Sequence, residues 1–152
     1  MKRHESLIPI SRQHHDGLLA ARLLQREAPA YHGLPTTPAA KCKYMQMFLA
    51  RQLKPHFLLE EETVFIFAQD ASEQLQQQAK KLEAEHRQLE QLITALPQTT
   101  ADELQDKLHE VGVLLEQHIR QEERQFFEQL QQELPEERLA SLKEQVEQHR
   151  LL

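Results

Sequence analysis

The stretch Lys54-Pro55-His56-Phe57-Leu58-Leu59-Glu60-Glu61-Glu62 places a histidine and a carboxylate among apolar residues. His56 and Glu60 are four residues apart, so on a helix their side chains leave the same face, about 40° apart around the axis. Burying such a pair without partners costs several kcal/mol, and a metal ion is the commonest partner for this combination. The stretch therefore predicts a metal site inside a helix bundle. The rest of the face is apolar and consists of Met45, Leu49, Leu53 and Phe67.

The composition predicts one all-α domain that spans residues 1–152. Only three residues are glycine, and Leu, Gln, Glu, Lys and Ala, all good helix formers, dominate. The formal charge of −6 gives no support to a nucleic-acid or anionic-membrane partner. Cys42 is the single cysteine, which excludes an internal disulfide and fits a reducing compartment. Because neither a signal peptide nor an apolar run of about 18 residues is visible, we expect a cytoplasmic protein without a membrane span.

Proline, glycine and capping residues divide the chain into four long helices. We expect these helices at about residues 11–27, 37–68, 70–97 and 100–134, followed by a short polar helix over 135–149. Pro55 lies inside the second helix and predicts a bend directly before His56. The pattern therefore predicts a four-helix bundle with a short C-terminal helix.

Two further helices repeat the histidine and glutamate spacing on apolar faces. His118 and Glu122 occupy consecutive positions of the fourth helix seam, and His86 occupies a seam position of the third helix, followed by Glu90. A turn near residue 71 places His56 and His86 at the same height in an antiparallel hairpin. The next turn leaves His118 displaced from His86 by roughly 12 Å, which tilt or a late helix start must absorb.

The first helix offers two candidate ligands. His15 lies three and four residues before Leu18 and Leu19, so we expect it on the apolar face. His14 is rotated by about 100° toward the edge of that face, and it would replace His15 if the helix were rotated.

These residues together resemble the hemerythrin-like (HHE cation-binding) domains. The resemblance rests on Ser11-Arg-Gln-His-His-Asp-Gly-Leu, Lys54-Pro-His-Phe-x-x-Glu-Glu-Glu, Glu85-His86 and Leu115-Glu-Gln-His-Ile-Arg-Gln-Glu-Glu-Arg-Gln-Phe-Phe. It implies an up-down-up-down bundle with a non-haem di-iron centre, bridged by oxide or hydroxide. By motif, the nitrogen ligands would be His15, His56, His86 and His118, and the bridging carboxylates would be Glu60 and Glu122.

The chain departs from oxygen-carrying hemerythrins at two positions. The third helix of those proteins supplies two histidines four residues apart, whereas in this chain Glu90 occupies the position four residues after His86. Their last carboxylate is an aspartate five residues after the histidine of the fourth helix, whereas Glu122 is four residues after His118. Glu90 is then an extra ligand, or a coordination position is open, and an open position favours chemistry or sensing over storage. The expected ligand is O2, NO or peroxide, bound for storage, sensing or repair. No nucleophile–base pair or cofactor motif names a catalytic reaction.

Three other interpretations compete with this one. A ferritin-like carboxylate oxidase needs Glu-x-x-His on two helices, and only Glu83 to His86 fits. Zinc suits three histidines and a carboxylate, and manganese is a further candidate metal. A metal-free helical interaction module would use residues 135–149 to dock a partner.

In the metal-site interpretation, Glu61 or Glu123 is expected, at most, to orient a ligand histidine.

Overall fold

The computed structural model describes residues 2–151, and within them it contains helices and no strand. The all-α expectation is therefore confirmed. Within residues 2–151, every helix is either too short or too polar to span a bilayer. The α-helices are α1 (Ile8–Leu24), α2 (Pro38–Phe48), α3 (Lys54–Glu62), α4 (Val64–Ala71), α5 (Glu73–Ala95), α6 (Ala101–Gln121), α7 (Phe127–Glu133) and α8 (Glu136–Arg150). Two π-helical turns, η1 (Leu49–Leu53) and η3 (Glu122–Phe126), and the 3₁₀ turn η2 (Leu96–Gln98) join some of them.

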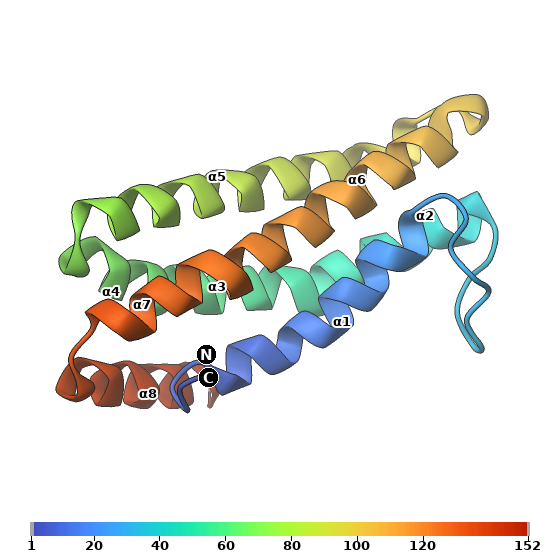
Figure 1. The fold of residues 1–152 in the computed structure, drawn as a ribbon. Helices are drawn as coiled ribbons and strands as arrows, with labels where there is room; N and C mark the ends of the chain where they lie inside the picture. Colours follow the sequence, from blue (N-terminus) through green and yellow to red (C-terminus); the bar gives the residue numbers. More distant parts are fainter. Residues whose placement is uncertain (1, 152) are drawn as a thin grey trace.

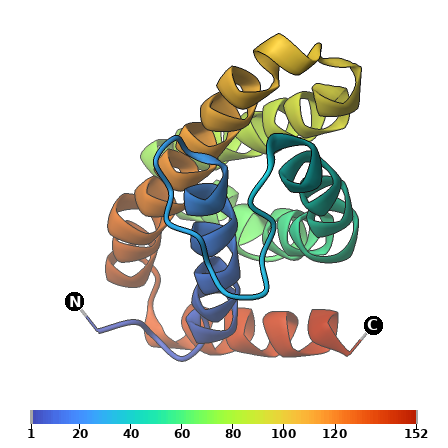
Figure 2. The same cartoon turned by 90° about the vertical axis from the view of Figure 1, so that its right-hand side faces the viewer.

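Four long helical segments lie side by side: α1, α2 with α3, α5, and α6 with α7 (Figure 1). Each segment runs in the direction opposite to the one before it, and α1 packs most extensively on α6. Helix α8 lies beneath the end of the bundle where α1 begins and α7 ends, as Figure 2 also shows. Buried Leu139, Leu142 and Val146 join α8 to the apolar core at that end.

The second long segment passes Pro55 without ending, because the π-turn η1 precedes it. Thr37 caps α2 through its side chain, which accepts a hydrogen bond from the backbone N–H of Ala40 at 3.2 Å. In η1 the N–H of Lys54 donates to the carbonyl of Leu49, five residues back. The extra residue in this turn lets the helix continue past a proline that has no N–H to donate.

The expectation that this helix continues to residue 68 is wrong. Thr63 leaves the helical conformation, with φ −126° and ψ −86°, and α4 begins at Val64. The hydroxyl of Thr63 donates to the carbonyl of Leu59 at 2.6 Å. Such a back-bond competes with the regular helix ladder and gives the local reason for the break.

The apolar core is divided into two clusters, with a layer of histidines and glutamates between them. On α5, Leu82 belongs to one cluster and Leu89 to the other, and His86 lies between them. Likewise Leu115 on α6 and Phe126 on η3 belong to different clusters, and His118 and Glu122 lie between them in the chain. The polar layer is therefore enclosed at both ends by close-packed side chains that exclude water.

Two glycines allow α1 and α6 to approach closely. A Cβ atom on Gly112 would lie 2.6 Å from the backbone oxygen of Ala21, and one on Gly17 would lie 2.8 Å from Cδ1 of Ile119. The second contact is with the end of a flexible side chain, whereas the first is with backbone. Gly112 therefore sets the separation of the two helices.

We predict that Gly112→Ala destabilises the protein by about 1–3 kcal/mol, because the new methyl group would displace the α1 backbone. Urea denaturation followed by circular dichroism measures this. Glu110→Ala, an exposed change on the same helix, is the control. A Gly112→Ala protein as stable as the parent would contradict this packing.

Candidate metal centre

Six buried side chains converge in the polar layer between the two apolar clusters. They form two overlapping groups of donor atoms, and within each group the atoms lie within 4.8 Å of one another. One group is His14, His56, Glu60 and Glu122, and the other is Glu60, His86, His118 and Glu122. Both glutamates belong to both groups, and both are fully buried. Each group could hold a cation, and the two groups overlap at the two carboxylates.

Most of these donor atoms have no hydrogen-bond partner in the described structure. This holds for Nε2 of His14, His86 and His118 and for both carboxylate oxygens of Glu60 and Glu122. Nε2 of His14 lies 2.8 Å from Oε1 of Glu122, and Nε2 of His86 lies 3.2 Å from Oε1 of Glu60, without hydrogen-bond alignment. Buried polar atoms are normally satisfied, so atoms left in this state and gathered together fit a bound cation.

The opposite ring nitrogen of each histidine is held by a neighbouring acceptor. Such contacts fix the ring orientation and the tautomer, and they leave Nε2 free to coordinate. The Nδ1 contacts are His14 with Glu123 at 2.6 Å, His56 with Gln13 at 2.7 Å, His86 with Glu61 at 2.7 Å and His118 with Glu85 at 2.7 Å.

The carboxylate that holds His14 is itself anchored by two other groups. Arg3 donates to the side chain of Glu123 at 3.2 Å and to its backbone oxygen at 2.8 Å, and the hydroxyl of Ser11 donates to the same carboxylate at 2.8 Å. By contrast, His56 is held by the neutral amide of Gln13. One of the four imidazoles therefore has a weaker acceptor behind it than the other three.

The π-turn η3 positions Glu122 beside the histidines. In this turn the N–H of Phe127 donates to the carbonyl of Glu122, five residues back. The wider turn lets Glu122 and both Phe126 and Phe127 face the core, and all three are fully buried. π-Helical turns of this kind are frequent at functional sites.

Phenylalanine rings contact all four imidazoles and stack on two of them. Phe57 stacks on His86 with ring centroids 3.8 Å apart and an interplanar angle of 11°. Phe127 stacks on His14 at 5.9 Å. The rings of His86 and His118 lie 4.9 Å apart, so the displacement of roughly 12 Å expected from sequence spacing does not occur.

The structure corrects the expectation for the first helix, because His14 joins the cluster and His15 does not. His15 is exposed, whereas the side chain of His14 is 3% exposed. Leu19, a residue of the expected apolar face, is also exposed at 40%. The informative signal is a run in alternating steps of three and four residues: Leu7, Ile10, His14, Gly17, Ala21 and Leu24.

The remaining expected residues divide between the cluster and its surroundings. His56, Glu60, His86, His118 and Glu122 lie together in the cluster. Glu90 lies outside both donor groups and pairs with Arg87 at 3.3 Å.

Glu61 and Glu123 orient ring nitrogens as the sequence suggested, but the roles of Gln13 and Glu85 were missed. Glu85 precedes His86 in the chain yet holds His118, a contact that only the packing of α5 against α6 reveals.

Without a cation, the cluster has strongly shifted pKa values. Burial, together with the charge of Glu60, raises the pKa of Glu122 well above its ordinary range. Burial also opposes ionisation of Glu60, but the charge of His56 outweighs it and holds the pKa of Glu60 well below its usual range. Burial lowers the pKa of His86, but contacts with Glu60 and Glu61 outweigh it and raise that pKa to about 9.

We predict that the metal-free protein loses stability as the pH rises from 6.5 to about 9. The raised pKa of His86 contributes stability that is fully present below 6.5 and is lost as the pH rises through the folded value. The raised pKa of Glu122 acts in the same direction, since ionising that carboxyl is costly in the folded state. Melting temperatures in the presence of a chelator measure this. His15→Gln should leave the trend unchanged, and a melting temperature that rises over this range would contradict it.

Comparison with known proteins identifies the family. A model of the hemerythrin HHE cation-binding domain matches residues 6–130, a range that contains all six clustered residues and ends before α8. No curated protein and no solved structure matched the chain. Because the match covers most of the chain, the protein belongs to the hemerythrin HHE cation-binding domain family.

Proposed function

We propose that the protein holds two iron ions in the polar layer and uses them to bind O2, NO or peroxide. His14 and His56 would hold one ion and His86 and His118 the other, while Glu60 and Glu122 would bridge the two. The observation that supports this most strongly is the pair of overlapping donor groups whose buried atoms have no other partner.

The charges and donor types support two cations and favour iron. When both are ionised, as metal ligands must be, the two fully buried carboxylates carry two negative charges, and no arginine or lysine belongs to the described cluster. Imidazole and carboxylate donors without a thiolate suit iron, and Cys42 lies in an apolar cluster away from this set. Iron bound here would supply a redox-active centre to which a small ligand can bind.

The donor count favours sensing or chemistry over oxygen storage. Four imidazoles and two shared carboxylates leave iron, which commonly takes about six ligands, with open positions. Glu90 does not fill one of them, because it lies outside the cluster and pairs with Arg87.

The alternating helix directions in Figure 1 favour the up-down-up-down order that the family resemblance implies. A reducing, cytoplasmic setting fits the free thiol of Cys42.

We predict about two iron ions per chain in freshly purified protein and a marked loss of iron in His14→Ala. His15→Ala is the matched control, since the neighbouring residue is exposed and should leave the iron content unchanged. Elemental analysis and the optical spectrum of oxidised and reduced protein measure this. Two zinc or two manganese ions per chain would refute the assignment of iron and leave the two-metal site standing. A colourless, metal-free protein whose melting temperature ignores chelators would support the helical interaction module instead.

The acceptors behind the histidines give a second prediction. Glu61→Gln, Glu85→Gln and Glu123→Gln should each weaken metal binding by about 10–100-fold, because a neutral amide holds the ring nitrogen less strongly. Competition with a chelator of known affinity measures the change. Glu90→Gln, a change in a glutamate outside the cluster, is the control. Equal affinities in all four variants would show that these contacts do not tune the site.

A further inference from the structure

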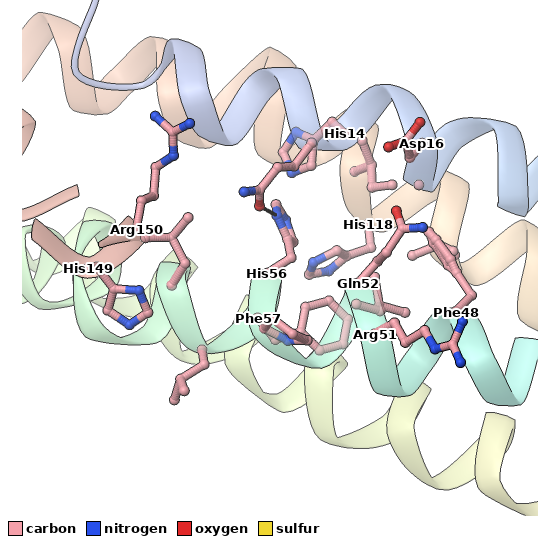
Figure 3. A pocket seen from close by; sticks show the side chains of 18 of the residues that line it. His14, Asp16, Phe48, Arg51, Gln52, His56, Phe57, His118, His149 and Arg150 are labelled. Carbon is pink, nitrogen blue, oxygen red and sulfur yellow. Dashed lines mark hydrogen bonds between the residues drawn. The ribbon is translucent and has the colours of Figure 1, made fainter. Parts of the chain in front are cut away.

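A cleft of about 650 Å³ opens between α1 and α3, directly beside the ligand histidines. Its inner wall includes the rings of His14, His56 and His118, together with Phe57. Figure 3 shows His149 and Arg150 at one end of the cleft and Phe48 and Arg51 at the other, with His56 and Phe57 between them. The cleft therefore connects the proposed metal centre to the surface.

The size of the cleft exceeds what a gas or peroxide requires. A water molecule occupies about 30 Å³ in the liquid, whereas pockets for organic ligands span about 300–1,000 Å³. The lining is mostly apolar, with Phe48, Leu53, Phe57 and Ile119 contributing to it. An apolar cleft of this volume fits an organic molecule rather than a diatomic ligand alone.

The charges at the rim favour an anionic group on that molecule. Arg51 and Arg150 are exposed and make no ion pair with any described residue. Glu62 is occupied by a contact of its Oε1 with Nε2 of His149 at 2.7 Å. Asp16 lies toward the other end of the cleft from Arg150 (Figure 3), and Glu62, the carboxylate at the Arg150 end, contacts His149 and makes no ion pair with Arg150.

Helix α8 supplies this end of the cleft, and it lies outside the residues that match the family model. Buried Leu142 and Val146 fix α8 against the core, and the contact between His149 and Glu62 ties its last turn to α3. Arg150 is thereby held at the mouth of the cleft. This feature belongs to the C-terminal segment and not to the matched domain.

We infer that the cleft binds an organic anion whose apolar body lies against Phe57 and whose anionic group pairs with Arg150. A bound molecule of this kind lies beside His56, which joins the proposed metal centre to the cleft wall. The inference goes beyond the proposed function and does not depend on which metal the centre holds, since neither Arg150 nor Phe57 is among the proposed ligands.

The test compares two fluorescent probes on the protein as purified. 8-Anilinonaphthalene-1-sulfonate carries a sulfonate, and N-phenyl-1-naphthylamine is its neutral counterpart with the same rings. Arg150→Gln should weaken binding of the anionic probe by about three- to tenfold and that of the neutral probe by less than about twofold. Arg26→Gln, a change at an arginine that pairs with Asp106 away from the cleft, is the matched control. Gln52→Trp should fill part of the cleft and weaken both probes.

Equal affinity for the two probes, or an unchanged affinity in both Arg150→Gln and Gln52→Trp, would overturn the inference. Metal content and circular dichroism, measured on the same samples, separate the two proposals. A metal-free chain with the expected probe pattern would refute the proposed function and leave the cleft as a binding site. A chain with two metal ions and no charge-dependent probe binding would refute the cleft alone.

Discussion

Two buried carboxylates and four buried imidazoles face one another between two apolar clusters of the core. Glu60 and Glu122 are fully buried, and the oxygen atoms of both lack hydrogen-bond partners in the described structure. Such an arrangement is unfavourable in a folded chain unless positive charge compensates it. The rest of the molecule can be understood as the means of holding these groups together: close-packed apolar clusters enclose them, and acceptors outside the cluster fix the histidine rings.

Local departures from regular helix geometry supply much of the precision. The π-turn η1 carries the chain past Pro55, and the π-turn η3 turns Glu122 into the core together with Phe126 and Phe127. Gly112 lets α6 lie close to α1, which supplies His14. The π-turns change which residues of their helices face the core, and Gly112 sets the separation of α1 and α6.

The two halves of the cluster differ in their surroundings. His86 and His118 are held by carboxylates, and Phe57 and Phe65 stack on His86. His56 is held by the neutral Gln13 and forms part of the cleft wall that α8 closes at one end. Of the four clustered imidazoles, His14, His56 and His118 line the cleft and His86 does not. Helix α8, which lies outside the matched residues, contributes His149 and Arg150 to one end of this cleft, whereas all six clustered residues come from the other helices.

The sequence by itself determined the helical class, the family and five of the six clustered residues, because histidines and glutamates at apolar seam positions can be found from helical periodicity alone. The tertiary structure decided the sixth: the apolar run that contains His14 begins at Leu7, before the expected start of the first helix, and the fold shows that this face of α1 packs on α6. It also decided which acceptor holds each ring: Glu85 is next to His86 in the chain but contacts His118. Such pairings depend on helix rotation and height, which follow from packing between helices and leave no periodic trace within any one of them.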